Sequence, residues 1–287
     1  MRVALLAILV SVGLRRHGSR ASSMSEGKEK SFDAMEEALE AAGNAHFLDE
    51  DLPTGMDYLF FVPDHKFLIC MPPKNGHTAM GTFCKCAERH RCSAQFSHAT
   101  VPIFAEILQD PGWRKVYVIR DPAERFLSVF LSKCAGHDGE KGLRVCRSQY
   151  RTSEITFNDA IDQLVKHGIR NPHWKQQHKY CGDLAKIHEQ FDVEIFYDGS
   201  TYAADLAKEL RLAGAMGADD IHLKECFNMT YEAHYNIKDA HIAHSEKLVL
   251  EYYESQAQVQ KVHDFYIDDY EIFNIPWPPE WFHSLPP

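Results

Sequence analysis

The sequence predicts an α/β fold, a three-layer sandwich in which a mostly parallel central sheet carries helices on both faces. Two apolar runs, Phe67–Met71 and Lys115–Ile119, have the length and composition of buried strands, and a segment with helical periodicity follows each. A third β-branched run, Val193–Tyr197, again lies between two helical patterns. Strands that alternate with helices form parallel sheets, because parallel neighbours need a crossover connection between them.

Length and charge limit the class of protein. The 287 residues suit one large domain with short extensions, and 45% hydrophobic with 25% charged residues is typical of a folded domain. The formal net charge is −10. A general nucleic-acid-binding protein would carry a basic surface, so we expect no nucleic-acid partner.

The N-terminal residues have features of a targeting segment. The apolar run Val3–Leu14 is shorter than the roughly 20 residues of a membrane-spanning helix and fits a secretory h-region better. We predict a signal peptide or short signal anchor over residues 1–20, a polar stem over 21–56 and the main domain over 57–287. Membrane attachment is expected only through the first segment, if it is uncleaved.

The chain has eight cysteines, an even number. In a secretory compartment some of them would form disulfides, although the sequence leaves the pairing open. Cys84, Cys86 and Cys92 lack a second Cys/His pair at zinc-finger spacing, so we expect disulfide or core roles and no metal site. The only glycosylation sequon begins at Asn228.

The first strand–turn–helix unit contains a loop suited to an anion. Pro72–Thr78 follows the strand, and the next helix is marked by apolar residues at Met80, Phe83, Cys84 and Ala87. Free N–H groups at the start of such a helix favour a phosphate or sulfate. Gly76 permits close approach of the backbone, Lys74 adds a cation and Thr78 a hydroxyl. The expected architecture is therefore P-loop-like, although the G-x-x-x-x-G-K-[ST] nucleotide sequence is absent.

The second unit ends its strand at Arg120. Pro122 suits the first position of the following helix, with Asp121 as its N-cap. Ser128 lies eight residues after Arg120, about two turns into that helix. Ligands of open α/β sheets bind at the carboxyl ends of strands, so Arg120 is a candidate ligand contact.

Further elements follow from periodicity and turn residues. Strands are expected at Tyr58–Val62 and Lys66–Met71, and helices over 101–108, from Phe157 to Gly168 and from Tyr202 to Gly214. Gly136–Arg151 is rich in glycine and charge, and we expect an irregular, mobile loop there. Ser245 is expected to cap one long helix that runs through Tyr253.

Four blocks of the sequence match a known pattern in order and spacing. Val62–Gly76 and Val118–Ser128 are followed by His173–Cys181 and by Val262–Asn274. These blocks resemble, in turn, the donor loop, the 3′-phosphate motif, a third block and the terminal helix of the Golgi carbohydrate sulfotransferases. That family includes the chondroitin, dermatan and HNK-1 enzymes, which use 3′-phosphoadenylyl sulfate (PAPS) as donor.

The resemblance implies PAPS-dependent transfer of a sulfuryl group to a glycan hydroxyl by in-line displacement in the Golgi. Lys74 would stabilise the leaving phosphate and the transferred group. Further contacts from the donor loop would come from Asn75, Gly76, His77 and Thr78. This scheme needs no metal.

Two other site residues are expected to bind the 3′-phosphate, Arg120 as a charge-assisted fork and Ser128 as a hydroxyl donor. His98 is the candidate general base, because a histidine titrates near neutral pH. It also follows the first helix, in the region where some glycan sulfotransferases keep their base. With 17 histidines in the chain, a purely structural role for His98 remains open.

Other functions also remain open. A sulfotransferase of this type can act on a protein tyrosine or a small alcohol instead of a glycan. A catalytically silent relative that binds nucleotide or glycan is another alternative, although Lys74, Arg120 and Ser128 occur together. A P-loop kinase is disfavoured by the missing Gly-Lys-Ser/Thr sequence.

Overall fold

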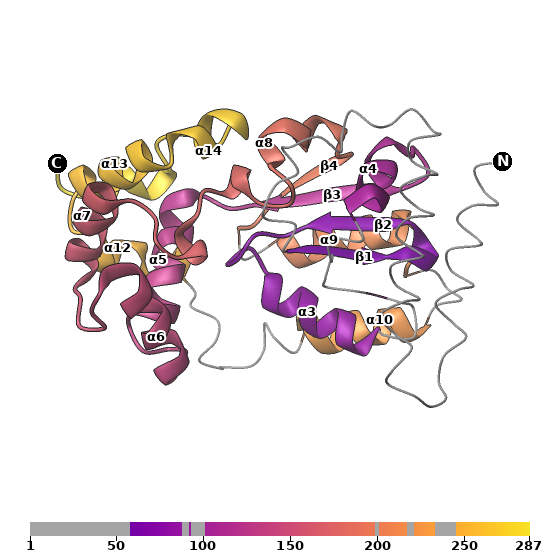
Figure 1. Ribbon diagram of the computed structural model, residues 1–287, viewed down its shortest axis with the longest axis horizontal. Helices are drawn as coiled ribbons and strands as arrows, with labels where there is room; N and C mark the ends of the chain where they lie inside the picture. Colours follow the sequence, from indigo (N-terminus) through magenta and orange to yellow (C-terminus); the bar gives the residue numbers. More distant parts are fainter. Residues whose placement is uncertain (1–57, 88–91, 93–100, 199–200, 217–220, 233–244) are drawn as a thin grey trace, which may run out of the picture. The chain divides into compact units, whose positions relative to one another are not determined.

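A computed structural model describes residues 58–87, 92, 101–198, 201–216, 221–232 and 245–287, which fall within one compact unit of residues 52–287 (Figure 1). The expected targeting segment and stem over 1–56, and the expected base His98, lie outside the described residues. In the described part of the chain, no helix is long and apolar enough to cross a membrane.

Four strands form one mixed sheet in the order β1-β2-β3-β4 (Figure 1). They are β1 (Leu59–Val62), β2 (Phe67–Cys70), β3 (Arg114–Ile119) and β4 (Val193–Phe196). The pairs β2–β3 and β3–β4 are parallel, whereas β1 pairs antiparallel with β2 through the tight connection at Pro63–His65. The mostly parallel sheet predicted from the sequence is confirmed.

The central strands are buried because helices cover both faces of the sheet. Leu68 and Cys70 of β2 point into one apolar cluster, and Phe67 and Ile69 point into a second. The same alternation continues on β3, as expected for side chains that point to opposite faces of a pleated strand. The predicted three-layer α/β sandwich is therefore confirmed.

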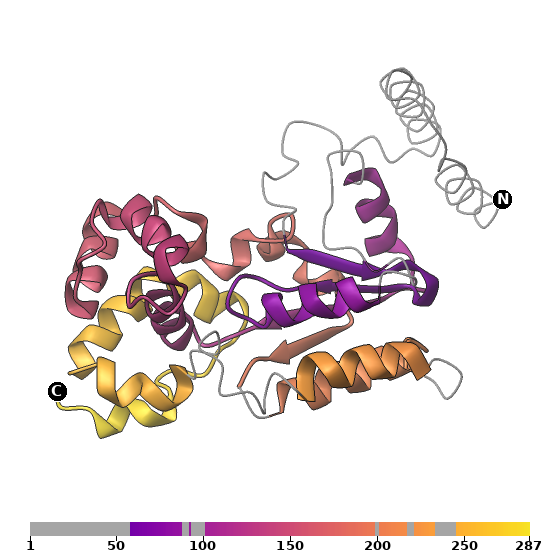
Figure 2. The ribbon, with the colours of Figure 1, turned by 90° about the horizontal axis from the view of Figure 1, so that it is seen from below.

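The second cluster is covered by α3 (His77–Cys86), α9 (Tyr202–Leu212) and α10 (Ile221–Phe227). Figure 2 shows the orange helices α9 and α10 on one side of the sheet and α4 (Val101–Gln109) on the other. The first cluster is formed by α4 and by the remaining helices α5 (Pro122–Lys133), α6 (Gly139–Tyr150), α7 (Phe157–His167), α8 (Leu184–Ile187), α12 (Ser245–Tyr252), α13 (Gln256–Phe265) and α14 (Ile267–Ile272).

The start of α5 follows the local sequence. Pro122 occupies the first turn, and the Asp121 carboxylate accepts a hydrogen bond from the backbone N–H of Glu124 at 2.9 Å. The cap satisfies one of the N–H groups that a helix leaves open at its start. It fixes the direction in which the chain leaves Arg120.

The prediction of an irregular loop over Gly136–Arg151 is wrong, because residues Gly139–Tyr150 form helix α6. A disulfide between Cys134 and Cys146 ties this helix to the end of α5. Cys146 and Tyr150 are buried in the first apolar cluster. Tertiary packing and the covalent link therefore outweigh the low helix propensity of the glycines.

The prediction of one long helix from Ser245 through Tyr253 is also wrong, because the structure has two helices there. Helix α12 ends at Tyr252, and α13 begins at Gln256 with Ser255 as its N-cap. The Gln258 side chain accepts a hydrogen bond from the N–H of Glu254 at 2.7 Å, so the break has its own local hydrogen bonds. The Ser-x-x-Gln spacing is a helix-start signal that the sequence contains.

All eight cysteines are paired. The disulfides join Cys70 to Cys181, Cys84 to Cys92, Cys86 to Cys226 and Cys134 to Cys146. The first of them ties strand β2, directly before the anion loop, to the block that begins at His173. The expected disulfide role of the cysteines is confirmed.

Candidate active site

The loop between β2 and α3 makes its turn with two residues in left-handed conformation, Lys74 (φ 74°) and Gly76 (φ 90°). The N–H of Asn75 donates to the carbonyl of Pro72 at 3.2 Å and closes the turn between them. A Cβ at Gly76 would lie 2.5 Å from the Tyr202 hydroxyl oxygen. Glycine is therefore required at this position by both the dihedral angle and the space.

Gly76 is the N-cap of α3 and has no side chain that could satisfy the first N–H groups of the helix. The first intrahelical bond runs from the N–H of Met80 to the carbonyl of Gly76 at 3.1 Å. The N–H groups of the residues between them are the open donors of a helix start. Thr78 is exposed beside them. A helix start of this kind can bind an anion, and binding at this loop stays a prediction.

Lys74 is the residue of this loop whose side chain can carry a positive charge toward a bound anion. The residue keeps part of its surface exposed, while its ammonium group is closely surrounded by protein. Burial and the neighbouring cation of Lys133 lower the pKa of Lys74 to about 7, against a smaller opposing effect of Asp138. Near neutral pH a bound anion would therefore favour the charged form of this lysine.

Arg120 lies beside the same loop at the carboxyl end of β3. It is 3% exposed, and its guanidinium donates to the carbonyl of Lys74 at 3.1 Å and to the hydroxyl of Ser245 at 2.6 Å. Its Nε is 3.7 Å from a carboxylate oxygen of Glu124, and the guanidinium lies 4.8 Å from the centre of the Tyr197 ring. The structure thus brings the two predicted donor-binding motifs together.

The other predicted donor residues take different positions. Ser128 is buried on α5, 4% exposed. His77 packs its ring against Tyr58 and Phe60, at centroid distances of 4.9 and 5.2 Å, and burial lowers its pKa to about 4. His77 is therefore neutral at pH 7. Whether these residues contact a donor stays a prediction.

Asn75 points into the protein rather than out of the loop. It is fully buried, and its amide donates to the carbonyl of Val118 at 2.9 Å and to the side-chain oxygen of Gln177 at 2.7 Å. Its side chain therefore links the loop to the end of β3. Any contribution of Asn75 to donor binding would act through the position of the loop.

Arg125 has a structural role in the interior beside the anion loop. It is 1% exposed, and its guanidinium donates to three carbonyls, of Pro73 at 3.0 Å, of Lys175 at 2.9 Å and of His173 at 3.2 Å. It thereby holds the anion loop against the block that begins at His173.

The comparison with protein-family models decides the family. Residues 57–276 match the model described as the sulfotransferase family. This chain is a sulfotransferase family member. Comparisons with curated proteins and with solved structures gave no significant match. The matched residues include both donor motifs and the terminal helices, so the predicted membership in a sulfotransferase family is confirmed.

Two charged groups close to Lys74 were missed in the sequence, namely Lys133 and Asp138. Lys133 forms an ion pair with Asp138, which also accepts a hydrogen bond from Ser132 at 2.6 Å. Burial raises the pKa of Asp138, but the bonds from Lys133 and Ser132 outweigh it and lower that pKa to about 2. The pKa of His173, the first residue of the third sequence block, is lowered to about 4 by burial and by the charges of Lys133 and Lys74.

The sulfotransferase also has a surface pocket of about 370 Å³ on α6 and α7. Its lining includes the cations Arg151, Lys166 and Arg170, together with Tyr150, Asp159, Asp162, Gln163 and His167. Both carboxylates are engaged elsewhere, Asp159 with Thr156 at 2.7 Å and Asp162 with Lys261 at 2.6 Å. Arg170 lies three residues before His173 in the sequence.

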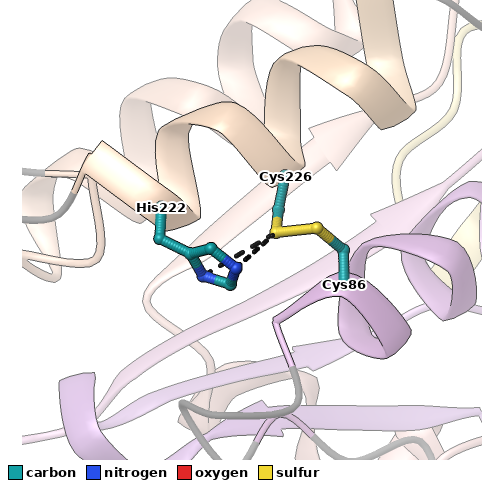
Figure 3. A group of neighbouring side chains, drawn as sticks. All are labelled: Cys86, His222 and Cys226. Atoms are coloured by element: carbon teal, nitrogen blue, oxygen red, sulfur yellow. Dashed lines mark hydrogen bonds between the residues drawn. A yellow bond between two sulfur atoms is a disulfide. The ribbon is translucent and has the colours of Figure 1, made fainter.

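One cluster of metal-ligating residue types occurs among the described residues, namely Cys86, His222 and Cys226 (Figure 3). The two cysteines form a disulfide, and the His222 ring nitrogens lie 3.7 and 3.9 Å from the Cys226 sulfur. Metals bind the thiolate, so the oxidised pair offers no such ligand. The absence of a metal from the reaction stays a prediction.

Proposed function

We propose that this sulfotransferase uses PAPS as donor and transfers its sulfuryl group to a hydroxyl of a glycan. The observation that carries the proposal is the 3.1 Å hydrogen bond from the Arg120 guanidinium to the carbonyl of Lys74. This bond joins Arg120 to the loop that carries Lys74. Both residues follow the carboxyl ends of adjacent parallel strands, where ligands of open sheets bind. PAPS carries anionic groups at both ends of its ribose, so two cationic elements match its charge.

In the proposed reaction the acceptor oxygen forms a bond to sulfur while the bond from sulfur to the 5′-phosphate oxygen breaks. Lys74 stabilises the charge that develops on the departing phosphate. His98 takes the proton of the acceptor hydroxyl. The products are the sulfated acceptor and adenosine 3′,5′-bisphosphate. Positioning and electrostatic stabilisation would provide most of the acceleration, by analogy with phosphoryl transfer.

The glycan acceptor is supported by the resemblance of the four sequence blocks to carbohydrate sulfotransferases and by the cations in the surface pocket on α6 and α7. The three cations of that pocket, Arg151, Lys166 and Arg170, are suited to polar and anionic groups of an extended acceptor. A small phenol would need an apolar cleft instead. A protein tyrosine, a small alcohol and a silent nucleotide-binding role remain the alternatives.

The acceptor experiment incubates the purified chain with labelled PAPS and a panel of glycans, tyrosine peptides and small alcohols. We expect label on a glycan. Label only on peptide tyrosines or small phenols would reject the glycan proposal, and no transfer to any acceptor despite PAPS binding would favour the silent alternative. Transfer of phosphate from ATP would instead support a kinase.

We further propose that the chain enters the secretory pathway and acts in the Golgi lumen. The pairing of all eight cysteines supports an oxidising compartment. Expression of the full chain in eukaryotic cells, followed by N-glycosidase treatment, tests this proposal. We expect a mobility shift that is lost in Asn228→Gln. An unglycosylated cytosolic protein with free thiols would contradict the compartment.

A further inference from the structure

Gln177 lies at the start of a short 3-10 turn, Gln177–Lys179, and is fully buried. Its side-chain amide forms a pair of hydrogen bonds with the backbone of Arg120. The Gln177 oxygen accepts from the N–H of Arg120 at 3.0 Å, and the Gln177 nitrogen donates to the Arg120 carbonyl at 2.8 Å. The amide thus continues the hydrogen bonding of the sheet for one residue beyond the end of β3.

The same amide also holds the anion loop. Its oxygen accepts a second hydrogen bond, from the amide nitrogen of Asn75 at 2.7 Å. An amide oxygen has two acceptor positions, and Gln177 uses one for the loop and one for the end of β3. The buried side chain of Gln177 therefore bonds directly to the anion loop, through Asn75, and to the backbone of Arg120.

Gln177 is itself held from the C-terminal part of the chain. The Asp269 carboxylate accepts from the backbone N–H of Gln177 at 2.8 Å and from that of His178 at 2.9 Å. Asp269 is fully buried on α14, and its oxygen also lies 2.7 Å from a ring nitrogen of His178. Asp269 therefore holds the backbone of the turn, while Asn75 and Arg120 hold the Gln177 side chain.

From these contacts we propose that Gln177 is a positioning residue that sets the distance between the anion loop and Arg120. The inference rests on the proposed function, in which the loop binds the 5′-phosphate and Arg120 the 3′-phosphate of one nucleotide. Two contacts to one ligand reinforce each other only when the geometry allows both at once. Gln177 does not touch the nucleotide in this proposal; it makes simultaneous contact possible.

The test measures how much the 3′-phosphate adds to affinity. Calorimetry on the full chain gives the dissociation constants of adenosine 3′,5′-bisphosphate and of adenosine 5′-monophosphate. The monophosphate constant divided by the bisphosphate constant reports the 3′-phosphate contact. In Gln177→Met, which keeps the volume and removes the amide, we expect this ratio to fall at least about tenfold. Binding of the monophosphate should change much less, because it needs the anion loop alone.

Gln149→Met is the matched control. Gln149 is 2% exposed, and its amide also makes three hydrogen bonds, to the carbonyl of Gly168 and from the N–H groups of Arg170 and Asn171, at 2.8–2.9 Å. We expect this substitution to lower thermal stability and to leave the affinity ratio at the parental value. The comparison separates positioning from a general loss of buried hydrogen bonds.

Gln177→Glu provides a second variant if Gln177→Met does not fold. It keeps an acceptor for Asn75 and for the Arg120 N–H but places an oxygen against the Arg120 carbonyl, so the ratio should again fall. A folded variant of either kind with the parental ratio would overturn the inference, even if both affinities dropped equally. A parent chain that binds neither nucleotide would instead reject the proposed function.

Discussion

At the scale of single residues, the site depends on which side chains keep a charge near neutral pH. Lys74 has a pKa of about 7, whereas the pKa values of His77 and His173 are about 4. Both histidines are therefore neutral between pH 6 and 9, and Lys74 is the group among these three that titrates there. Its charge should respond to an anion that enters the loop.

This response gives a pH prediction for nucleotide binding. An anion beside Lys74 stabilises the ammonium, so binding raises its pKa above 7 and takes up a proton when the pH exceeds 7. Affinity for adenosine 3′,5′-bisphosphate should therefore fall as the pH rises from 7 to 9. Calorimetry in buffers with different ionisation enthalpies measures the uptake. Lys74→Met should abolish it; equal uptake in that variant would assign the proton to another group.

A second residue-scale prediction separates binding from chemistry. Arg120→Ala removes a charge-assisted contact that is present before and during transfer, and the loss should be about 1.5–3 kcal/mol, roughly ten- to more than a hundredfold in affinity for the bisphosphate. His98→Ala should leave this affinity nearly unchanged and lower turnover on the order of 10²–10⁴-fold. Calorimetry on both variants measures the affinity, and turnover assays on both measure the chemical step. Normal turnover in His98→Ala would place the base elsewhere.

At the scale of elements, the junction between β2 and α3 has the tightest steric requirement in the described site. Gly76→Ala would place a methyl group 2.5 Å from the Tyr202 hydroxyl at a φ of +90°. We expect a loss of unfolding free energy of about 1–3 kcal/mol and weaker nucleotide binding. Denaturant unfolding measures the first and calorimetry the second.

Gly81→Ala is the control for this substitution. Gly81 lies within the same helix α3, and a Cβ there has no heavy atom within 4 Å. Alanine in a helix interior should raise the unfolding free energy by roughly 0.5–1 kcal/mol. Equal destabilisation by both substitutions would show that the clash with Tyr202 is not the cause.

At the scale of the whole molecule, disulfides connect the site to distant parts of the chain. The Cys70–Cys181 bond closes a loop with a sequence separation of 111, and the Cys134–Cys146 bond one of 12. On the chain-entropy account, removal should cost about 4–5 kcal/mol for the first and roughly 3 kcal/mol for the second. Unfolding of the two paired Cys→Ala variants tests this order, and a larger loss for the shorter loop would contradict it.

The sequence by itself determined the local features: the three parallel strands, the loop with Lys74 and Gly76, the capped start of α5 and the position of Arg120 at a strand end. Each depends on residues within a few positions of one another. Periodicity, helix caps and turn residues act over that distance, so they can be recognised without knowing the fold. The α6 error has the opposite cause, since packing and a disulfide stabilise that helix.

Tertiary structure alone decided which side chains meet. Arg120 donates to Ser245, 125 residues away. Gln177 accepts a bond from Asn75 and donates one to Asp269, 102 and 92 residues away. Tertiary structure likewise brought Arg125 against the anion loop and Lys133 close to Lys74. A buried polar group must find a hydrogen-bond partner wherever the fold supplies one. That partner is chosen by the packing of distant segments, which no local pattern in the sequence encodes.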